Sequence, residues 1–216
     1  MRSSFRLPRV YPITDTRVSG LSHAEQVARL AAGGATVVQL RDKHAPPSDF
    51  YEQAKAALEV ARQHEVRLII NDRVDIALAL GAGGVHLGQD DLPPEAARTL
   101  LGDDVVVGFS THNLAQAIEA STWPIDYLAL GPIFATSTKE NPDPVVGLEL
   151  LRAVRRAIGE RPLVAIGGIS HLNAWEAIEA GADSVALISG LFAGPAGVSE
   201  ALQNLLQLLS DCENPL

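Results

Sequence analysis

Residues 163–190 read LVAIGGISHLNAWEAIEAGADSVALISG and contain one full repeat of the pattern that decides the fold. An apolar run at 163–169 predicts a strand, an amphipathic run at 172–180 predicts a helix, and an apolar run at 184–190 predicts a second strand. Gly181 follows the helical run, where a left-handed residue commonly ends a helix. Both predicted strands are apolar enough to be buried on both faces, which is typical of parallel sheets.

The same unit recurs along the whole chain. The predicted strands cover residues 10–15, 36–43, 67–72, 84–89, 105–110, 127–133, 163–169 and 184–190. The predicted helices include 23–32, 49–64, 94–101, 114–120, 148–158, 172–180 and 198–209. Ser22, Ser48, Asn113 and Ser170 precede helical runs and are expected to act as N-caps.

Eight strands that alternate with helices predict an α/β protein with a single domain, a (β/α)8 TIM barrel. The barrel is expected over residues 10–209, with short tails at 1–9 and 210–216. An open doubly wound sheet is the alternative. It ranks lower because the first strand is followed by ITDTR at 13–17 and not by a glycine-rich dinucleotide loop.

Composition limits the partners. The chain has 216 residues and a formal net charge of −9, which argues against nucleic acid or an anionic membrane as the main partner. Residues 1–9 lack the apolar core of a secretory signal, and no run approaches the roughly 20 apolar residues of a membrane span. The single cysteine, Cys212, allows no intramolecular disulfide and fits a cytoplasmic location. Small molecules are therefore the expected partners, and a homo-oligomer is left open.

The chain contains 3 lysines and 14 arginines, so lysine is not its default cation. Lys43 and Lys139 each follow an apolar run that predicts a buried strand, whereas Lys55 lies in a helical pattern. In a barrel the active site forms at the C-terminal strand ends. A lysine there is a mobile point charge that suits a terminal phosphate, although an isolated lysine is usually a solvated loop residue.

The second predicted strand carries a polar run at its end. Gln39, Arg41 and Lys43 share one side-chain parity, so all three are expected to point into the barrel mouth. Asp42 is expected to point towards the helices. An inward cluster of cations is costly unless an anion or water meets it, and a surface rim of ion pairs is the alternative.

Two aspartates follow neighbouring strands, and together they could hold one divalent ion. Asp72 ends the third predicted strand, and Asp91 or its neighbour Asp90 follows the fourth. Mg²⁺ typically binds one or two protein carboxylates together with phosphate oxygens and water. Taken singly, each aspartate fits a helix N-cap or a solvated loop equally well.

Further polar groups end the remaining strands. Gly167-Gly168-Ile169 and Ile188-Ser189-Gly190 end strands seven and eight, where barrels commonly bind a phosphate. The long segment 134–146 holds Thr136, Ser137, Thr138 and Lys139, and fits either a binding loop or a surface excursion.

Three side chains near the fourth and fifth predicted strands are of types that take part in catalysis. His86 is expected to be packed and hydrogen-bonded, and His112 fits either the mouth or a helix start. Ser110 lacks an evident His-Asp pair, so it is interpreted as a hydrogen-bonding group and not as a nucleophile. One diphosphate site and one monophosphate site in the same mouth favour a transferase.

These residues resemble the thiamine-phosphate synthase family over about residues 11–201. The resemblance is carried by residues 39–43, Asn71-Asp72-Arg73, 86–89 with Asp91, 108–112, 131–134 with 136–139, 167–169 and Ile188-Ser189. It implies a transferase that joins a hydroxymethylpyrimidine diphosphate to a thiazole phosphate and releases pyrophosphate. Ala135 departs from the family, which usually has proline there.

The resemblance also implies a role for each residue. The pyrimidine diphosphate would be bound by Gln39, Leu40, Arg41, Asp42, Lys43, Asn71, Ser110 and Lys139, with Arg41, Lys43, Ser110 and Lys139 as the catalytic set. The thiazole phosphate would be bound by Thr136, Ser137, Thr138, Gly168, Ile188 and Ser189. Asp72 and Asp91 would hold one Mg²⁺, which selects Asp91 over Asp90 by motif position.

The hypothesis for the mechanism is a dissociative substitution that needs no general base. Three alternative functions remain for a barrel with these residues. A thiazole tautomerase would not need the diphosphate and metal residues, and a non-catalytic sensor would not need Asp72, Asp91 and the cations together. A sugar-phosphate isomerase would more often present an acid/base pair.

Overall fold

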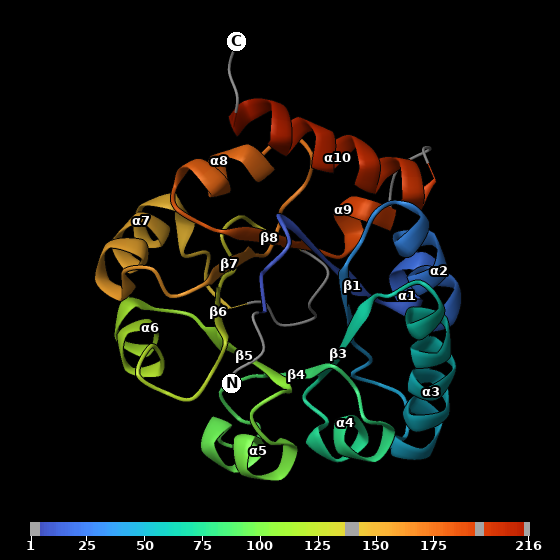
Figure 1. The fold of residues 1–216 in the computed structure, drawn as a ribbon. Helices are drawn as coiled ribbons and strands as arrows, with labels where there is room; N and C mark the ends of the chain where they lie inside the picture. The colour runs from blue at the N-terminus through green and yellow to red at the C-terminus, as the bar shows by residue number, and fades with distance from the viewer. Residues whose placement is uncertain (1–4, 137–142, 193–196, 214–216) are drawn as a thin grey trace.

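The computed structural model describes residues 5–136, 143–192 and 197–213. Eight parallel strands form a closed barrel in the order β1-β2-β3-β4-β5-β6-β7-β8, and helices surround it (Figure 1). The strands are β1 Val10–Thr14, β2 Val37–Leu40, β3 Arg67–Asn71, β4 Gly84–Leu87, β5 Val106–Thr111, β6 Tyr127–Leu130, β7 Leu163–Ile166 and β8 Ser184–Leu187. The predicted (β/α)8 barrel is confirmed.

The helices lie between successive strands and form the outer ring. They are α1 Thr16–Ser19, α2 His23–Ala32, α3 Pro47–Gln63, α4 Val74–Leu80, α5 Pro94–Leu101, α6 Leu114–Ala120, α7 Gly147–Ile158, α8 Ala174–Glu179, α9 Ser189–Phe192 and α10 Val198–Glu213. No range was predicted for α1, α4 or α9. The helix α4 ends at Gly81, which has a left-handed conformation. None of the helices within the described ranges is long and apolar enough to cross a membrane.

Two of the four predicted N-caps are confirmed and two are wrong. Ser22 forms a capping box with Glu25 at the start of α2, and Asn113 accepts a hydrogen bond from the Gln116 backbone N–H at the start of α6. Ser48 lies inside α3, which begins one residue earlier at Pro47, because proline is favoured at the first helical position. Ser170 begins a turn, and α8 starts only at Ala174.

Alternation along each strand divides the buried side chains into two layers. Outward residues such as Val38, Leu40 and Val85 pack against the helices in one large core. Inward residues fill the barrel, where the largest are Tyr11 and Tyr127. The barrel is therefore a packed core from its N-terminal end up to the layer below the C-terminal strand ends.

One glycine makes the interior packing possible. Gly108 on β5 pairs with Tyr127 on β6, and a Cβ at Gly108 would overlap the Tyr127 ring. Only glycine leaves room for the phenol to lie inside the barrel at this level. At the N-terminal end, Phe5 and Leu7 pack against the same inner cluster, and the Arg67 guanidinium lies 5.5 Å from the centre of the Phe5 ring.

Candidate active site

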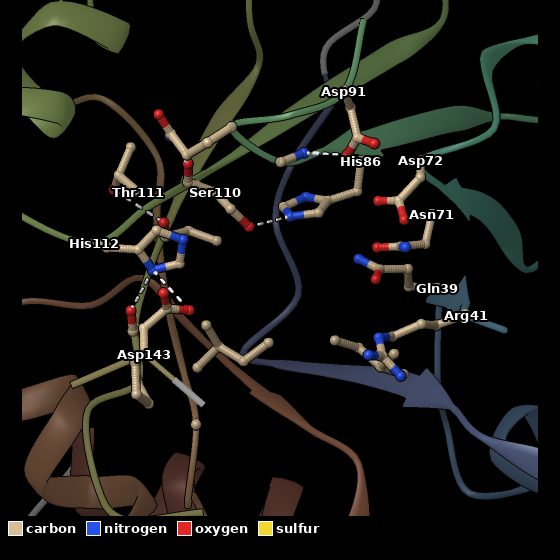
Figure 2. A pocket seen from close by; sticks show the side chains of 18 of the residues that line it. Gln39, Arg41, Asn71, Asp72, His86, Asp91, Ser110, Thr111, His112 and Asp143 are labelled. Atoms are coloured by element: carbon tan, nitrogen blue, oxygen red, sulfur yellow. Dashed lines mark hydrogen bonds and ion pairs between the residues drawn. The ribbon is translucent and has the colours of Figure 1, made fainter. Parts of the chain in front are cut away.

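A cavity of about 530 Å³ opens at the C-terminal ends of the strands. Every strand or the segment directly after it contributes at least one lining residue, as expected for the mouth of a barrel. In Figure 2, Gln39, Arg41, Asn71, Asp72 and Asp91 lie along one side, and Ser110, Thr111, His112 and Asp143 lie across from them. The volume is within the range that small-molecule sites usually have.

The polar run after β2 has the predicted parity. Gln39, Arg41 and Lys43 all line the cavity. The Nη1 atom of Arg41 lies 3.3 Å from Asp15 Oδ2, and Lys43 forms an ion pair with Asp72. Both cations therefore lie at the mouth with one carboxylate partner each, which leaves donors that a phosphate oxygen could bind.

The side chains of Leu40 and Asp42 point away from the cavity. Leu40 is completely buried in the layer between barrel and helices. The Asp42 carboxylate accepts hydrogen bonds from the backbone N–H groups of His44 and Ala45, at 2.8 and 2.9 Å, and orders the loop after Lys43. Any ligand contact that these two residues make in the cavity must come from the backbone.

Asp72 and Asp91 face the same cavity from the ends of β3 and β4. Asp72 has a φ of 62°, an uncommon conformation for a residue other than glycine, and such strain tends to occur at functional sites. Asp91 Oδ2 accepts a hydrogen bond of 2.7 Å from the Gly88 backbone N–H. Burial raises the pKa of the Asp91 carboxyl, and the nearby Asp72 raises it further.

This acidic pair fits a divalent cation that also binds ligand oxygens. Two carboxylates that disfavour each other's charge gain from a shared cation. Within the described ranges, no group of three or more His, Cys, Asp or Glu residues could hold a metal by itself. A Mg²⁺ ion bound by Asp72 and Asp91 would therefore complete its coordination with water and phosphate oxygens. Asp90 also lines the cavity and is exposed.

His86 and Ser110 form the part of the cavity floor contributed by β4 and β5. The Nε2 atom of His86 lies 2.8 Å from Ser110 Oγ, and its Nδ1 atom lies 2.9 Å from the Tyr127 hydroxyl (Figure 2 shows the first contact). Burial lowers the pKa of His86 to about 4. The prediction that His86 is packed and hydrogen-bonded is confirmed, and a neutral imidazole is expected at neutral pH.

The segments after β5 and β6 line the opposite side. His112 Nδ1 lies 2.8 Å from the Gly131 carbonyl oxygen and 3.8 Å from Asp143 Oδ2. His112 thus contributes to the mouth, which was one of its two predicted positions. Gln116 and Asp143 also line the cavity and were missed, because one lies within a helix and the other far along the segment after β6.

Only part of the predicted phosphate site at the ends of β7 and β8 lies within the described residues. Thr136, Gly167 and Ile188 line the cavity. Gly168 and Ser189 are the next residues in the sequence after Gly167 and Ile188. Gly168 has a φ of 65°, and a Cβ there would overlap the Ala135 carbonyl oxygen, so close packing with the β6 segment requires glycine. Ser137, Thr138 and Lys139 lie outside the described residues.

Comparisons with known proteins agree with this geometry. The profile of a family described as thiamine monophosphate synthase matches residues 10–191. The chain is 48% identical over 213 residues to the thiamine-phosphate synthase of Koribacter versatilis (strain Ellin345), covering 95% of this chain and 99% of that protein. It is 45% identical over 203 residues to the thiamine-phosphate synthase of Chloroflexus aurantiacus, covering 94% and 93% of the two chains.

Among solved structures, the fold is similar to thiamine phosphate pyrophosphorylase from Pyrococcus furiosus. The TM-score is 0.84 at 35% sequence identity, and the alignment covers 95% of this chain and 97% of the other. The similarity therefore spans the whole barrel and its mouth, not an isolated motif.

Proposed function

From the premise that this chain belongs to the thiamine monophosphate synthase family, and is a transferase of that kind, we propose how its cavity performs the reaction. The substrates would be 4-amino-2-methyl-5-(diphosphooxymethyl)pyrimidine and a thiazole phosphate, and the products thiamine phosphate and pyrophosphate. The observation that supports this assignment best is the placement of Arg41, Lys43, Asp72 and Asp91 around one cavity at the strand ends. Two cations and a carboxylate pair suit a diphosphate with one Mg²⁺.

The diphosphate would bind between the β2 and β3 ends. Arg41 and Lys43 stabilise the negative charge that grows on the leaving oxygen as the bond between carbon and oxygen breaks. Bound Mg²⁺, held by Asp72 and Asp91, would supply further neutralisation of the pyrophosphate charge. Lys139 was predicted to join them from the segment after β6, and this role remains a prediction.

The pyrimidine would lie over the polar floor of the cavity. Gln39, Asn71 and Ser110 offer amide and hydroxyl groups to the ring from three different strands. The aminopyrimidine delocalises the positive charge that remains on its methylene carbon after pyrophosphate leaves. The thiazole nitrogen then attacks this carbon with its own lone pair, so no proton has to be removed and no general base is needed.

The thiazole phosphate would bind at the ends of β7 and β8. The proposed contacts are Thr136, Ser137, Thr138, Gly168, Ile188 and Ser189. Of these, Ser137 and Thr138 lie outside the described ranges. The close approach of Gly167 and Gly168 to the β6 segment brings this end within the same cavity. A cytoplasmic location remains a prediction, and a homo-oligomer is left open.

One assay tests the proposal. The purified chain is mixed with both phosphorylated substrates and Mg²⁺, and thiamine phosphate and pyrophosphate are measured. Equal amounts of the two products support the reaction, and the absence of both overturns it. An Asp72→Ala variant with near-normal turnover in Mg²⁺ would contradict the metal assignment, with Asp90→Ala as the matched control on the same cavity.

A further inference from the structure

A chain of polar side chains crosses the barrel directly beneath the cavity. Gln39 Nε2 donates to the Tyr11 hydroxyl at 3.1 Å, and the Tyr11 and Tyr127 hydroxyls lie 2.9 Å apart. Tyr127 continues to His86 Nδ1 at 2.9 Å, and His86 Nε2 reaches Ser110 Oγ at 2.8 Å. The chain therefore joins two cavity residues, Gln39 on β2 and Ser110 on β5, through three side chains that the proposed reaction does not use.

The inner members of this hydrogen-bonded chain are buried. Tyr11 is 1% exposed, Tyr127 is 0% exposed, and His86 is 7% exposed. Burial raises the pKa of both phenols well above the usual range, so both keep their proton at neutral pH. Buried polar groups of this kind need a partner for each donor, because an unmade hydrogen bond there is costly.

The number of protons sets the direction of every bond. The Gln39 amide nitrogen can only donate, so the Tyr11 oxygen accepts and the Tyr11 proton must go to the Tyr127 oxygen. Among the residues that the structure describes, the Tyr127 proton then has only His86 Nδ1 to receive it. An imidazole that accepts at Nδ1 is neutral and carries its proton on Nε2, because a cationic ring would donate from both nitrogens. The Nε2 proton is donated to Ser110 Oγ.

Ser110 is therefore left with its own hydroxyl proton for the cavity. We propose that the chain Gln39–Tyr11–Tyr127–His86 commits the Ser110 hydroxyl to donate a hydrogen bond to an acceptor of the bound pyrimidine diphosphate. Tyr11, Tyr127 and His86 are then positioning residues that act through Ser110. This inference rests on the proposed function for its ligand, but the direction of the hydrogen bonds follows from the protein alone.

The same reasoning predicts what the cavity rejects. In the opposite direction, Ser110 would donate to His86 Nε2 and could only accept from the ligand. With the observed Gln39 orientation, a ligand that places a hydrogen-bond acceptor at Ser110 is favoured over one that places a donor there. Both a ring nitrogen and a diphosphate oxygen are such acceptors.

The first test reads the tautomer directly and needs no substrate. Nitrogen-15 spectra of histidine-labelled protein at neutral pH should show His86 protonated at Nε2 and bare at Nδ1, with the signals assigned by their loss in His86→Gln. The opposite tautomer would overturn the proposal, because Ser110 would then donate to His86. The His86 tautomer can be read whether or not the protein makes thiamine phosphate. The test therefore separates failure of this inference from failure of the proposed function.

The second test compares hydroxyl removals along the chain. Tyr127→Phe removes the donor to His86, and we expect kcat/KM for the pyrimidine diphosphate to fall about tenfold, as for one lost hydrogen bond. Tyr11→Phe leaves the Tyr127–His86 bond in place and should cost clearly less, although both rings are equally buried. Tyr51→Phe is the control, because it removes a hydroxyl on α3 that is not part of the hydrogen-bonded chain, and its kcat/KM should be unchanged.

A double-mutant cycle shows whether Tyr127 acts through Ser110 or only through packing. In a Ser110→Ala background, Tyr127→Phe should cause no further loss of kcat/KM, whereas fully additive losses would overturn the proposal. Inhibition by inorganic pyrophosphate then identifies the acceptor. Weaker inhibition in Tyr127→Phe assigns a phosphate oxygen, and unchanged inhibition with weaker pyrimidine binding assigns the ring.

Discussion

His86 should make the stability of this protein sensitive to acid. Burial lowers its pKa from 6.5 to about 4 in the folded chain, while the unfolded chain keeps the ordinary value. Below pH 6.5 the unfolded state therefore binds a proton that the folded state does not. The stabilising contribution is complete above pH 6.5 and is lost progressively as the pH falls towards 4.

The size of this loss follows from the two pKa values. One unit of difference corresponds to roughly 1.4 kcal/mol, so the full shift is worth about 3 kcal/mol. Integrated over pH, the loss relative to pH 8 is about 2 kcal/mol at pH 5 and about 3 kcal/mol at pH 4. For a domain with a typical total stability of about 5–15 kcal/mol, this is a large change from one side chain.

The assay is urea unfolding of the wild type and His86→Gln at a series of pH values from 8 to 4. His86→Gln should be less stable at pH 8, because it loses hydrogen bonds to Tyr127 and Ser110, but its stability should fall less steeply with acid. Comparison with the wild type cancels the carboxyl groups and His23, whose pKa is also lowered by burial. His171→Gln, a change of an exposed histidine, should follow the wild-type curve.

One outcome would refute the reasoning. If the wild type and His86→Gln lose stability in parallel between pH 8 and pH 4, His86 does not change its proton affinity on folding. The neutral state assigned to His86 would then be wrong, and the direction inferred for its hydrogen bond to Ser110 would lose its basis.

Four other predictions concern the mouth and the barrel interior. Asp91→Asn should lower Mg²⁺-dependent turnover by more than the roughly 10–100-fold typical of outer-shell metal partners, whereas Asp90→Asn should stay within a few-fold. Because burial and Asp72 raise the pKa of Asp91, the same Asp91→Asn change should raise the melting temperature of the ligand-free protein at pH 7, and a lower value would contradict this. Gly108→Ala should cost about 3 kcal/mol or more in urea unfolding, since its methyl group would overlap the Tyr127 ring. Ser184→Ala should leave stability unchanged or raise it, because the buried Ser184 hydroxyl has no hydrogen-bond partner within the described part of the protein, and a loss above about 1 kcal/mol would argue for a partner.

The sequence predicted the barrel well because its signals are local. Each strand is an apolar run next to a turn, and strand parity needs only the two-residue repeat of a strand. That repeat placed Gln39, Arg41 and Lys43 in the mouth and Asp42 outside it. The wrong caps at Ser48 and Ser170 have local causes as well, since Pro47 and the turn before Ala174 compete with the serine for the helix start.

The hydrogen-bonded chain beneath the cavity could not be predicted in this way. Tyr11 and Tyr127 read as apolar residues of buried strands, and their hydroxyl contact joins positions 116 residues apart. Their inward parity was available, but parity does not state which rings meet across the barrel. That depends on the register of all eight strands and on the space that Gly108 leaves.

The ion pairs at the mouth also change how the cations are interpreted. Lys43 was predicted to bind a phosphate of the ligand. In the structure it contacts Asp72, one of the two proposed metal ligands. Lys43 contacts Asp72 Oδ2 only, so the other carboxylate oxygen, Oδ1, could bind Mg²⁺ without displacing the lysine. A cation on Asp72 would weaken the attraction between its carboxylate and Lys43, and would thereby favour a contact of the lysine with the diphosphate. The Asp72 carboxylate thus pairs with Lys43 and, under the proposed function, links metal binding to diphosphate binding.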